Sequence, residues 1–138
     1  MEDLAAAVGV VRAGADRWGV EPDRVGVLGF SAGAIMAIEL GARPGPSQPD
    51  FIAAVYPSLV DFHPQPPVPP LFVVTTNDDP LFAQRGFGLI DGWQAAEGSV
   101  ELHCYRDGGH GFGMRPAGKA SDRWIDALHD WLKTGGYC

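Results

Sequence analysis

Four short apolar runs, separated by segments of helical or turn-forming character, constrain the fold of this chain most. The runs are Val25–Phe30, Phe51–Tyr56, Leu71–Thr76 and Val100–Tyr105. Continuous apolar runs of this length are typical of strands that are buried on both faces. Because segments with helical patterns lie between them, the sequence predicts an α/β fold of about four parallel strands with helices on both faces of the sheet.

The segments around these runs complete the expected order. Helices are predicted over Glu2–Trp18, residues 32–40, Leu81–Ala96 and Lys119–Lys133. The stretch Pro57–Pro70 is too rich in proline to form a regular element. We expect it to be a loop at the carboxyl edge of the sheet, where α/β folds bind ligands. The length of 138 residues favours a single domain over residues 1–138.

Composition excludes several classes of function. The net charge of −7 disfavours binding to nucleic acid or to an anionic membrane surface, because both need a concentrated basic surface. The longest apolar runs are far shorter than a membrane-spanning helix, and the acidic start does not resemble a signal peptide. A cytoplasmic location is therefore expected. The histidines and acids lack the spacing of metal ligands, so we expect no metal and no cofactor.

Two cysteines are too few for a disulfide framework. Cys104 lies inside an apolar run, which predicts a small buried side chain. Cys138 is the last residue and is expected to be frayed.

The first group with catalytic potential is the turn Gly29-Phe30-Ser31-Ala32-Gly33. Small residues around a serine, between a strand and a helix, allow a sharp turn that exposes the hydroxyl group. The start of the following helix directs N–H groups and a positive dipole end towards a developing oxyanion. The pattern thus makes Ser31 a candidate nucleophile, the alternative being a serine that only caps a helix.

A serine hydroxyl needs a base to accept its proton, and the chain has four histidines. His110 lies in the glycine-rich segment 108–113, directly after the last predicted strand, and is the favoured base. His129 is expected on the solvated face of the last helix, and His103 is expected to be structural. His63 lies in the proline-rich loop, where it could contact a substrate.

The base in turn needs a carboxylate that orients it. Asp78 and Asp79 follow the third strand and fall between Ser31 and His110, the chain order that this type of fold requires. Asp79 is the favoured partner of His110, and Asp78 remains an alternative, since one of the two could instead cap a helix. Asp107 is a weaker candidate because it is so close to His110 in sequence.

With these residues in place, the chain resembles a known family. The segments GFSAGA, TTNDDPLF and GGHGFG, in this order, are similar to the acetyl-xylan esterase-like carbohydrate-esterase branch of the α/β hydrolases, which is related to dienelactone hydrolase. The resemblance implies an α/β-hydrolase fold with Ser31 as nucleophile, Asp79 as acid and His110 as base. It also implies that the N–H of Ala32 is one oxyanion donor.

The resemblance covers only the second part of the family's fold, so a truncated, minimal α/β-hydrolase fold is expected. Relatives carry further strands and a loop with a second oxyanion donor before the region that matches. A strand that is central in those relatives would lie at an edge here, and open edges favour pairing. We therefore expect a homo-oligomer, most simply a dimer, in which the partner could supply the second donor.

The expected function is that of a serine esterase that hydrolyses small-molecule esters with short, acetyl-type acyl groups through an acyl-enzyme. Residues expected to line the substrate pocket are Phe30, Pro57, His63 and Phe112. The alternative is a non-catalytic binding module with a relic triad, in which Trp93 and the proline-rich loop line a ligand cleft. A glycan-chain hydrolase is disfavoured, because adjacent carboxylates cannot lie on both sides of a glycosidic bond.

Overall fold

The computed structural model describes residues 1–82 and 86–138 and contains one parallel sheet. Its four strands lie in the order β1-β2-β3-β4, which is also their order in the chain. They are β1 Val27–Phe30, β2 Ile52–Val55, β3 Leu71–Thr76 and β4 Val100–Tyr105. All three neighbouring pairs are parallel, so every strand ends at the same edge of the sheet. The predicted α/β fold with four parallel strands is confirmed.

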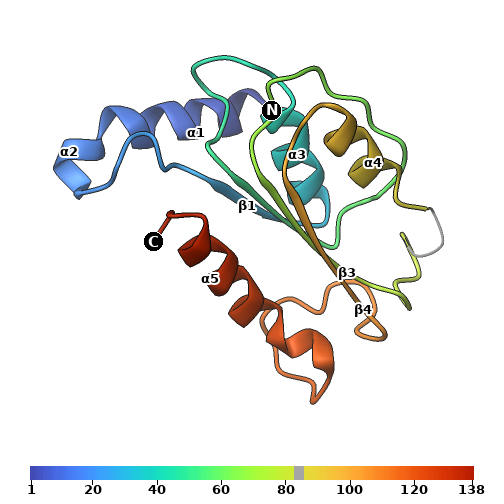
Figure 1. Ribbon diagram of the computed structural model, residues 1–138. Helices are drawn as coiled ribbons and strands as arrows, with labels where there is room; N and C mark the ends of the chain where they lie inside the picture. The colour runs from blue at the N-terminus through green and yellow to red at the C-terminus, as the bar shows by residue number, and fades with distance from the viewer. Residues whose placement is uncertain (83–85) are drawn as a thin grey trace.

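Helices cover both faces of this sheet, as predicted. Helices α3 (Ala32–Gly41) and α4 (Gly88–Ala95) lie on one side, and α5 (Trp124–Thr134) lies on the other (Figure 1). Side chains of β2 and β3 alternate between the two cores because successive residues of a strand face opposite sides. The first core contains Ala54 and Val73 with α3 and α4, and the second contains Val55 and Val74 with α5.

The first predicted helix is broken into two. Helix α1 covers Glu2–Ala13, and the short α2 covers Ala15–Trp18. The break falls at Gly14, where a Cβ atom would collide with the ring of Trp18. The indole of Trp18 therefore folds back over Gly14, and the chain turns there. Both helices lie at the β1 end of the molecule (Figure 1).

The helix predicted over Leu81–Ala96 begins later, at Gly88. The N–H groups of Leu81 and Phe82 donate to a side-chain oxygen of Asp79, so these residues form a turn and not a helix. Gly86 then adopts a φ of +76°, which a helix cannot include. Residues 83–85 of that prediction lie outside the described part of the chain. The last predicted helix also differs, because its first turn, Ala120–Arg123, is a 3₁₀-helix.

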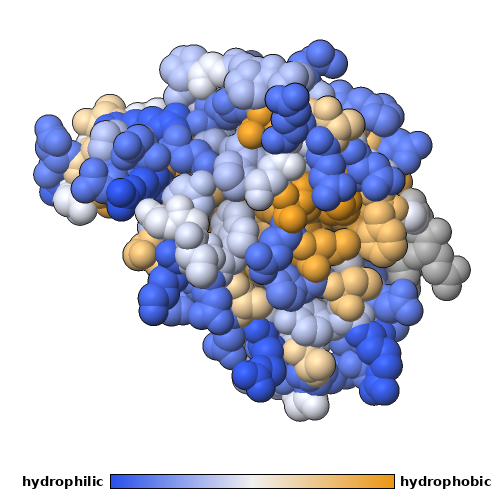
Figure 2. All heavy atoms as spheres, viewed as in Figure 1, coloured by the Kyte–Doolittle hydropathy of each residue, from blue (hydrophilic) through white to orange (hydrophobic). Residues whose placement is uncertain are grey.

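The proline-rich segment only begins at the carboxyl edge of the sheet. Its later part runs back along α4, where the N–H of Leu89 donates to the carbonyl of Leu59 and Gly92 packs closely against Phe62. Figure 2 shows apolar side chains gathered on the side of α3 and this segment, where Ile35 and Val60 line a shallow groove. The expectation that the whole segment forms a ligand loop at that edge is therefore corrected.

The sheet has two edges, and both expose side chains. On β1, Leu28 is 44% exposed and Phe30 is 37% exposed, although the ring of Phe30 also contacts Trp124 at the start of α5. On β4, Cys104 is exposed, so the prediction of a buried thiol is wrong. The reason is that β4 pairs only with β3 and forms the other edge. Among the described residues, no helix is long and apolar enough to cross a membrane.

Candidate active site

Ser31 lies at the sharp turn between β1 and α3. Its backbone has a φ of +52° and a ψ of −119°, a conformation that costs energy for a residue with a side chain. Two features hold it there: the N–H of Ser31 donates to the carbonyl of Val55 over 2.9 Å, and Gly29 approaches the backbone of Gly33 so closely that a Cβ would collide with it. The turn therefore presents the serine side chain clear of both elements.

His110 reaches Ser31 from the loop after β4. Its Nε2 lies 2.8 Å from Ser31 Oγ, although the two residues are 79 positions apart. The imidazole is largely shielded, with 18% of the side chain exposed. Its ring is flanked by Phe82 and by Tyr56, with ring centroids 5.2 Å and 5.0 Å away.

Asp79 holds the other nitrogen of this imidazole. Its Oδ2 lies 2.8 Å from His110 Nδ1, and its side chain is fully buried. The other oxygen, Oδ1, accepts N–H bonds from Leu81 at 2.8 Å and Phe82 at 3.1 Å. These two bonds fix the rotation of the carboxylate, so Oδ2 is directed at His110. Ser31, His110 and Asp79 are thus hydrogen-bonded in a row.

Asp78, the alternative acid, does not contact the imidazole. Its Oδ1 accepts hydrogen bonds from the N–H groups of Gly108 at 2.9 Å and Gly109 at 2.7 Å. The hydrogen bond from Gly109, supported by the one from Gly108, lowers the pKa of the Asp78 carboxyl group. Asp107 pairs with the exposed side chain of Arg106 instead of with His110.

Ala32 is the first residue of α3, so its N–H has no acceptor within the helix. It directly follows Ser31 and lies at the positive end of the helix dipole. A negatively charged oxygen that develops next to Ser31 Oγ can therefore accept a hydrogen bond from this group.

Of the expected pocket residues, Phe30 and Phe112 lie beside the hydrogen-bonded row of Ser31, His110 and Asp79. Pro57 and His63 do not line an open pocket there. Tyr56 connects the two phenylalanines, with ring centroids 5.9 Å from Phe30 and 4.8 Å from Phe112. Pro57 is buried. His63 is exposed beside Gly92 of α4, and within residues 1–82 and 86–138 it has no contact with Ser31 or His110.

Sequence reasoning missed Tyr56. It directly follows β2, is buried, and has a φ of +44°, which is unusual for a tyrosine. Burial raises the pKa of its hydroxyl group. A tyrosine at the carboxyl end of a strand next to the one that leads into Ser31 is the signal that could have indicated it.

The other side chains singled out above have structural or solvent-exposed positions. Trp93 is fully buried and its Nε1 donates to the Pro69 carbonyl, so it cannot line a ligand cleft. His103 packs against Phe72 and hydrogen-bonds Glu101, which confirms a structural position. His129 is solvated as predicted, with 67% of its side chain exposed.

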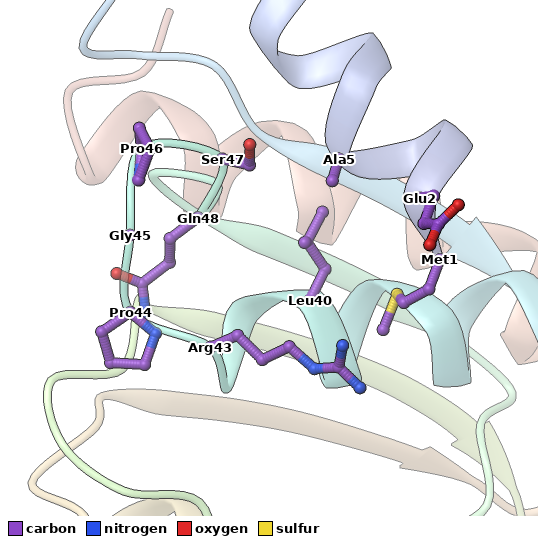
Figure 3. Close-up of a pocket in the computed structure, with 10 residues that line it drawn as sticks. All are labelled: Met1, Glu2, Ala5, Leu40, Arg43, Pro44, Gly45, Pro46, Ser47 and Gln48. Atoms are coloured by element: carbon purple, nitrogen blue, oxygen red, sulfur yellow. The ribbon is translucent and has the colours of Figure 1, made fainter.

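Another hollow of the surface, formed by described residues, lies away from Ser31. It lies between the start of α1, the end of α3 and residues 43–48, with Glu2 and Arg43 among its lining side chains (Figure 3). Since α3 begins next to Ser31 and ends at Gly41, this hollow lies at the opposite end of that helix. Within the described ranges, no group of three or more His, Cys, Asp or Glu side chains could hold a metal ion.

Solved structures share this fold. One is an acetyl ester-xyloside bifunctional hydrolase from Caldicellulosiruptor lactoaceticus, with a TM-score of 0.84 and 22% identity over 99% of this chain and 65% of that one. A second is an α/β hydrolase from a Medee basin deep-sea metagenome library, with a TM-score of 0.81 and 25% identity over 96% of this chain and 62% of the other. A third is a thermophilic esterase from the planctomycete Thermogutta terrifontis, with butyrate bound. Its TM-score is 0.82 and its identity 18%, over 98% of this chain and 65% of the esterase.

The chain therefore spans slightly less than two thirds of the length of these three proteins. No curated protein matches the sequence. Residues 2–135, almost the whole chain, match one family. The chain belongs to the dienelactone hydrolase family.

Proposed function

We propose that this protein is a serine esterase that hydrolyses carboxylic esters with short acyl groups. The observation that carries the proposal is the row of hydrogen bonds from Ser31 Oγ through His110 to Asp79, with both distances at 2.8 Å. Such a row is what converts a weakly nucleophilic hydroxyl group into a reactive one.

The proposed steps follow from the tautomer that the row favours. The buried Asp79 carboxylate accepts a hydrogen bond from Nδ1–H of His110, so the proton stays on Nδ1 and Nε2 keeps a lone pair for the hydroxyl proton of Ser31. Ser31 Oγ attacks the ester carbonyl, and Nε2 takes its proton. The protonated imidazole then donates that proton to the departing alcohol, leaving an acyl group on Ser31. A water molecule, deprotonated by Nε2, then attacks the acyl group, and the imidazolium returns this proton to Ser31 Oγ as the carboxylic acid leaves.

The oxyanion of each tetrahedral intermediate would be stabilised by the N–H of Ala32. Loss of one donor from an oxyanion hole costs about 10²–10³ in rate, so a second donor has a large effect on turnover. We propose that a second protein surface supplies it and adds to the N–H of Ala32 at the amino end of α3. The exposed face of β1 next to the site is compatible with such a contact.

Short acyl groups are favoured by the surroundings of Ser31. Phe30, Tyr56 and Phe112 form a compact aromatic surface beside the imidazole, suited to a small apolar group. The bound butyrate of the Thermogutta esterase and the acetyl ester named for the Caldicellulosiruptor hydrolase support this substrate class.

The test is hydrolysis of p-nitrophenyl acetate, butyrate and octanoate, together with labelling by a fluorophosphonate. We expect the two short esters to be preferred, and peptide mapping to find the label on Ser31. Ser31→Ala should lose both activities, whereas His129→Ala, a change at an exposed helix position, should keep them. Equal hydrolysis by Ser31→Ala and the native chain would refute the proposal. A folded chain that neither reacts nor hydrolyses would favour the non-catalytic binding module.

We also propose that the chain forms a homodimer through the β1 edge, where Leu28 and Phe30 are exposed. Sedimentation velocity at micromolar concentration should show a dimer for the native chain and a monomer for Leu28→Glu. A native chain that sediments as a clean monomer would contradict this assignment.

A further inference from the structure

The loop that carries His110 is rich in glycine, which weakens its own preference for a single conformation. Gly109, Gly111 and Gly113 all adopt positive φ angles, of 71°, 78° and 51°. Glycine has the largest conformational freedom to lose on folding, so a loop with this composition is intrinsically flexible. Yet the imidazole must stay within hydrogen-bond distance of Ser31 for the proton to move. Contacts from outside the loop must therefore fix it.

Those contacts come from the end of β3. Oδ1 of Asp78 accepts the N–H groups of Gly108 and Gly109, over 2.9 Å and 2.7 Å. Thr76 Oγ1 donates to the carbonyl of Gly109 over 2.9 Å. Gly109 is thereby held through its N–H and its carbonyl, and that carbonyl belongs to the peptide unit that leads into His110.

Close packing supports the same arrangement. A Cβ on Gly108 would collide with the methyl group of Thr76 and would lie 2.9 Å from Ser121 Oγ. The backbone of the loop thus lies directly on β3 and on the 3₁₀ turn before α5. Because residue 108 has no side chain, its backbone lies close enough to β3 for its N–H to reach Asp78.

We propose that Asp78 is a positioning residue that holds the backbone of the His110 loop, while its neighbour Asp79 holds the imidazole ring. This assignment rests on the proposed function, in which His110 is the base. The two adjacent carboxylates have different partners: Asp79 bonds the ring nitrogen, and Asp78 bonds the two N–H groups that precede the histidine. Together they fix both the path of the chain and the orientation of the ring.

Asp122 provides a matched control within the same chain. Its Oδ2 accepts the N–H groups of Ala117, Gly118 and Lys119 at 2.9, 2.7 and 3.1 Å. It is therefore also a carboxylate that holds the backbone of a glycine-containing loop, but that loop carries no group of the proposed mechanism.

The experiment compares Asp78→Ala, Asp78→Asn and Asp122→Ala. We expect Asp78→Ala to lower kcat and the rate of fluorophosphonate labelling by about 10²-fold with little change in KM, because a small displacement of a catalytic group has effects of that size. Asp78→Asn should recover most of the loss, since its amide oxygen can still accept both N–H groups. Asp122→Ala should keep the native kcat and labelling rate.

Nuclear magnetic resonance gives a readout that does not depend on activity. The proton between His110 Nδ1 and Asp79 should give a low-field signal in the native chain and in Asp122→Ala. In Asp78→Ala it should be lost or broadened by exchange, and the amides of Gly108 and Gly109 should exchange faster with solvent. If Asp78→Ala does not fold, Thr76→Val, which removes the donor to Gly109, should change these signals in the same direction.

Two results would overturn the proposal. One is a native low-field signal and native amide protection at Gly108 and Gly109 in the Asp78→Ala variant. The other is an equal loss of kcat in Asp78→Ala and Asp122→Ala at matched stability, which would indicate general destabilisation. If the native chain neither hydrolyses esters nor reacts with the probe, the proposed function fails, and the resonance measurements still decide the role of Asp78.

Discussion

Two glycine-rich turns bring Ser31 and His110 together, and they are held in different ways. The turn of residues 29–33 is held by backbone contacts: Gly29 packs against Gly33, and the N–H of Ser31 donates to the carbonyl of Val55 at the end of β2. The loop of residues 108–113 is held by side chains of a distant segment, Thr76, Asp78 and Asp79. The first turn is thus fixed by backbone groups, whereas the second depends on side chains about thirty residues away in sequence.

The largest expected effect in the second turn is that of Asp79→Asn. The N–H groups of Leu81 and Phe82 require an oxygen at the Oδ1 position, so the amide NH₂ would replace Oδ2 and face His110. It would then donate to Nδ1 and stabilise the wrong tautomer, with a fall in kcat of about 10⁴-fold. Steady-state hydrolysis of p-nitrophenyl acetate measures this. A loss below tenfold would show that Asp79 does not orient the base.

The first turn is tested by Gly29→Ala and its control Gly33→Ala. A Cβ at residue 29 meets the backbone of residue 33, so overpacking should reduce the free energy of unfolding by about 3 kcal/mol. A Cβ at residue 33 meets no atom within 4 Å and lies in a helix, so the second variant should keep the native stability or gain about 0.5–1 kcal/mol. Urea titration distinguishes the two. Equal effects would mean that the turn is not held by this close approach.

The pH dependence of stability tests the second turn alone, through the carboxyl group of Asp78. The pKa of Asp78 is lower in the folded chain than its ordinary value near 3.8, mainly because of the hydrogen bond from Gly109. Its contribution is therefore present above about pH 4 and is lost as the pH falls through the folded-state pKa. The melting temperature of the native chain should fall more steeply below pH 4 than that of Asp78→Asn. Parallel curves would contradict the expected contribution of the ionised carboxylate.

The smallest effect on kcat is expected where the two turns meet. The ring of Tyr56 contacts Phe30 of the first turn and His110 of the second, and the hydroxyl group takes no part in these contacts. Tyr56→Phe should therefore change kcat by less than about threefold, in line with the small effects of volume-conserving changes. Tyr56→Ala should lower the free energy of unfolding by about 3–5 kcal/mol, the usual cost of removing a buried aromatic ring. A large loss of kcat in Tyr56→Phe would instead assign a chemical role to the hydroxyl group.

The sequence allowed prediction of the strands more reliably than of the helices. β3 and β4 have the predicted bounds, since a short apolar run between turn residues defines both ends. The helix expected over Leu81–Ala96 was placed too early, because its first residues bond to Asp79 instead of to one another. Cys104 and Trp93 differ from prediction for a related reason. The sequence around Cys104 does not reveal that its strand is an edge, and the sequence around Trp93 does not reveal that its ring is buried in a core.

By itself, the sequence determined the parallel sheet and the turn at Ser31. Both depend on residues close together in the chain: apolar runs between helical segments, and glycines that permit one sharp backbone turn. The tertiary structure decided which carboxylate meets His110. Asp78 and Asp79 are adjacent and chemically identical, so only the position of the loop after β4 assigns the ring nitrogen to one and the two backbone N–H groups to the other. Hydrogen bonds act over about 3 Å, and such distances between remote segments are set by packing, not by sequence spacing.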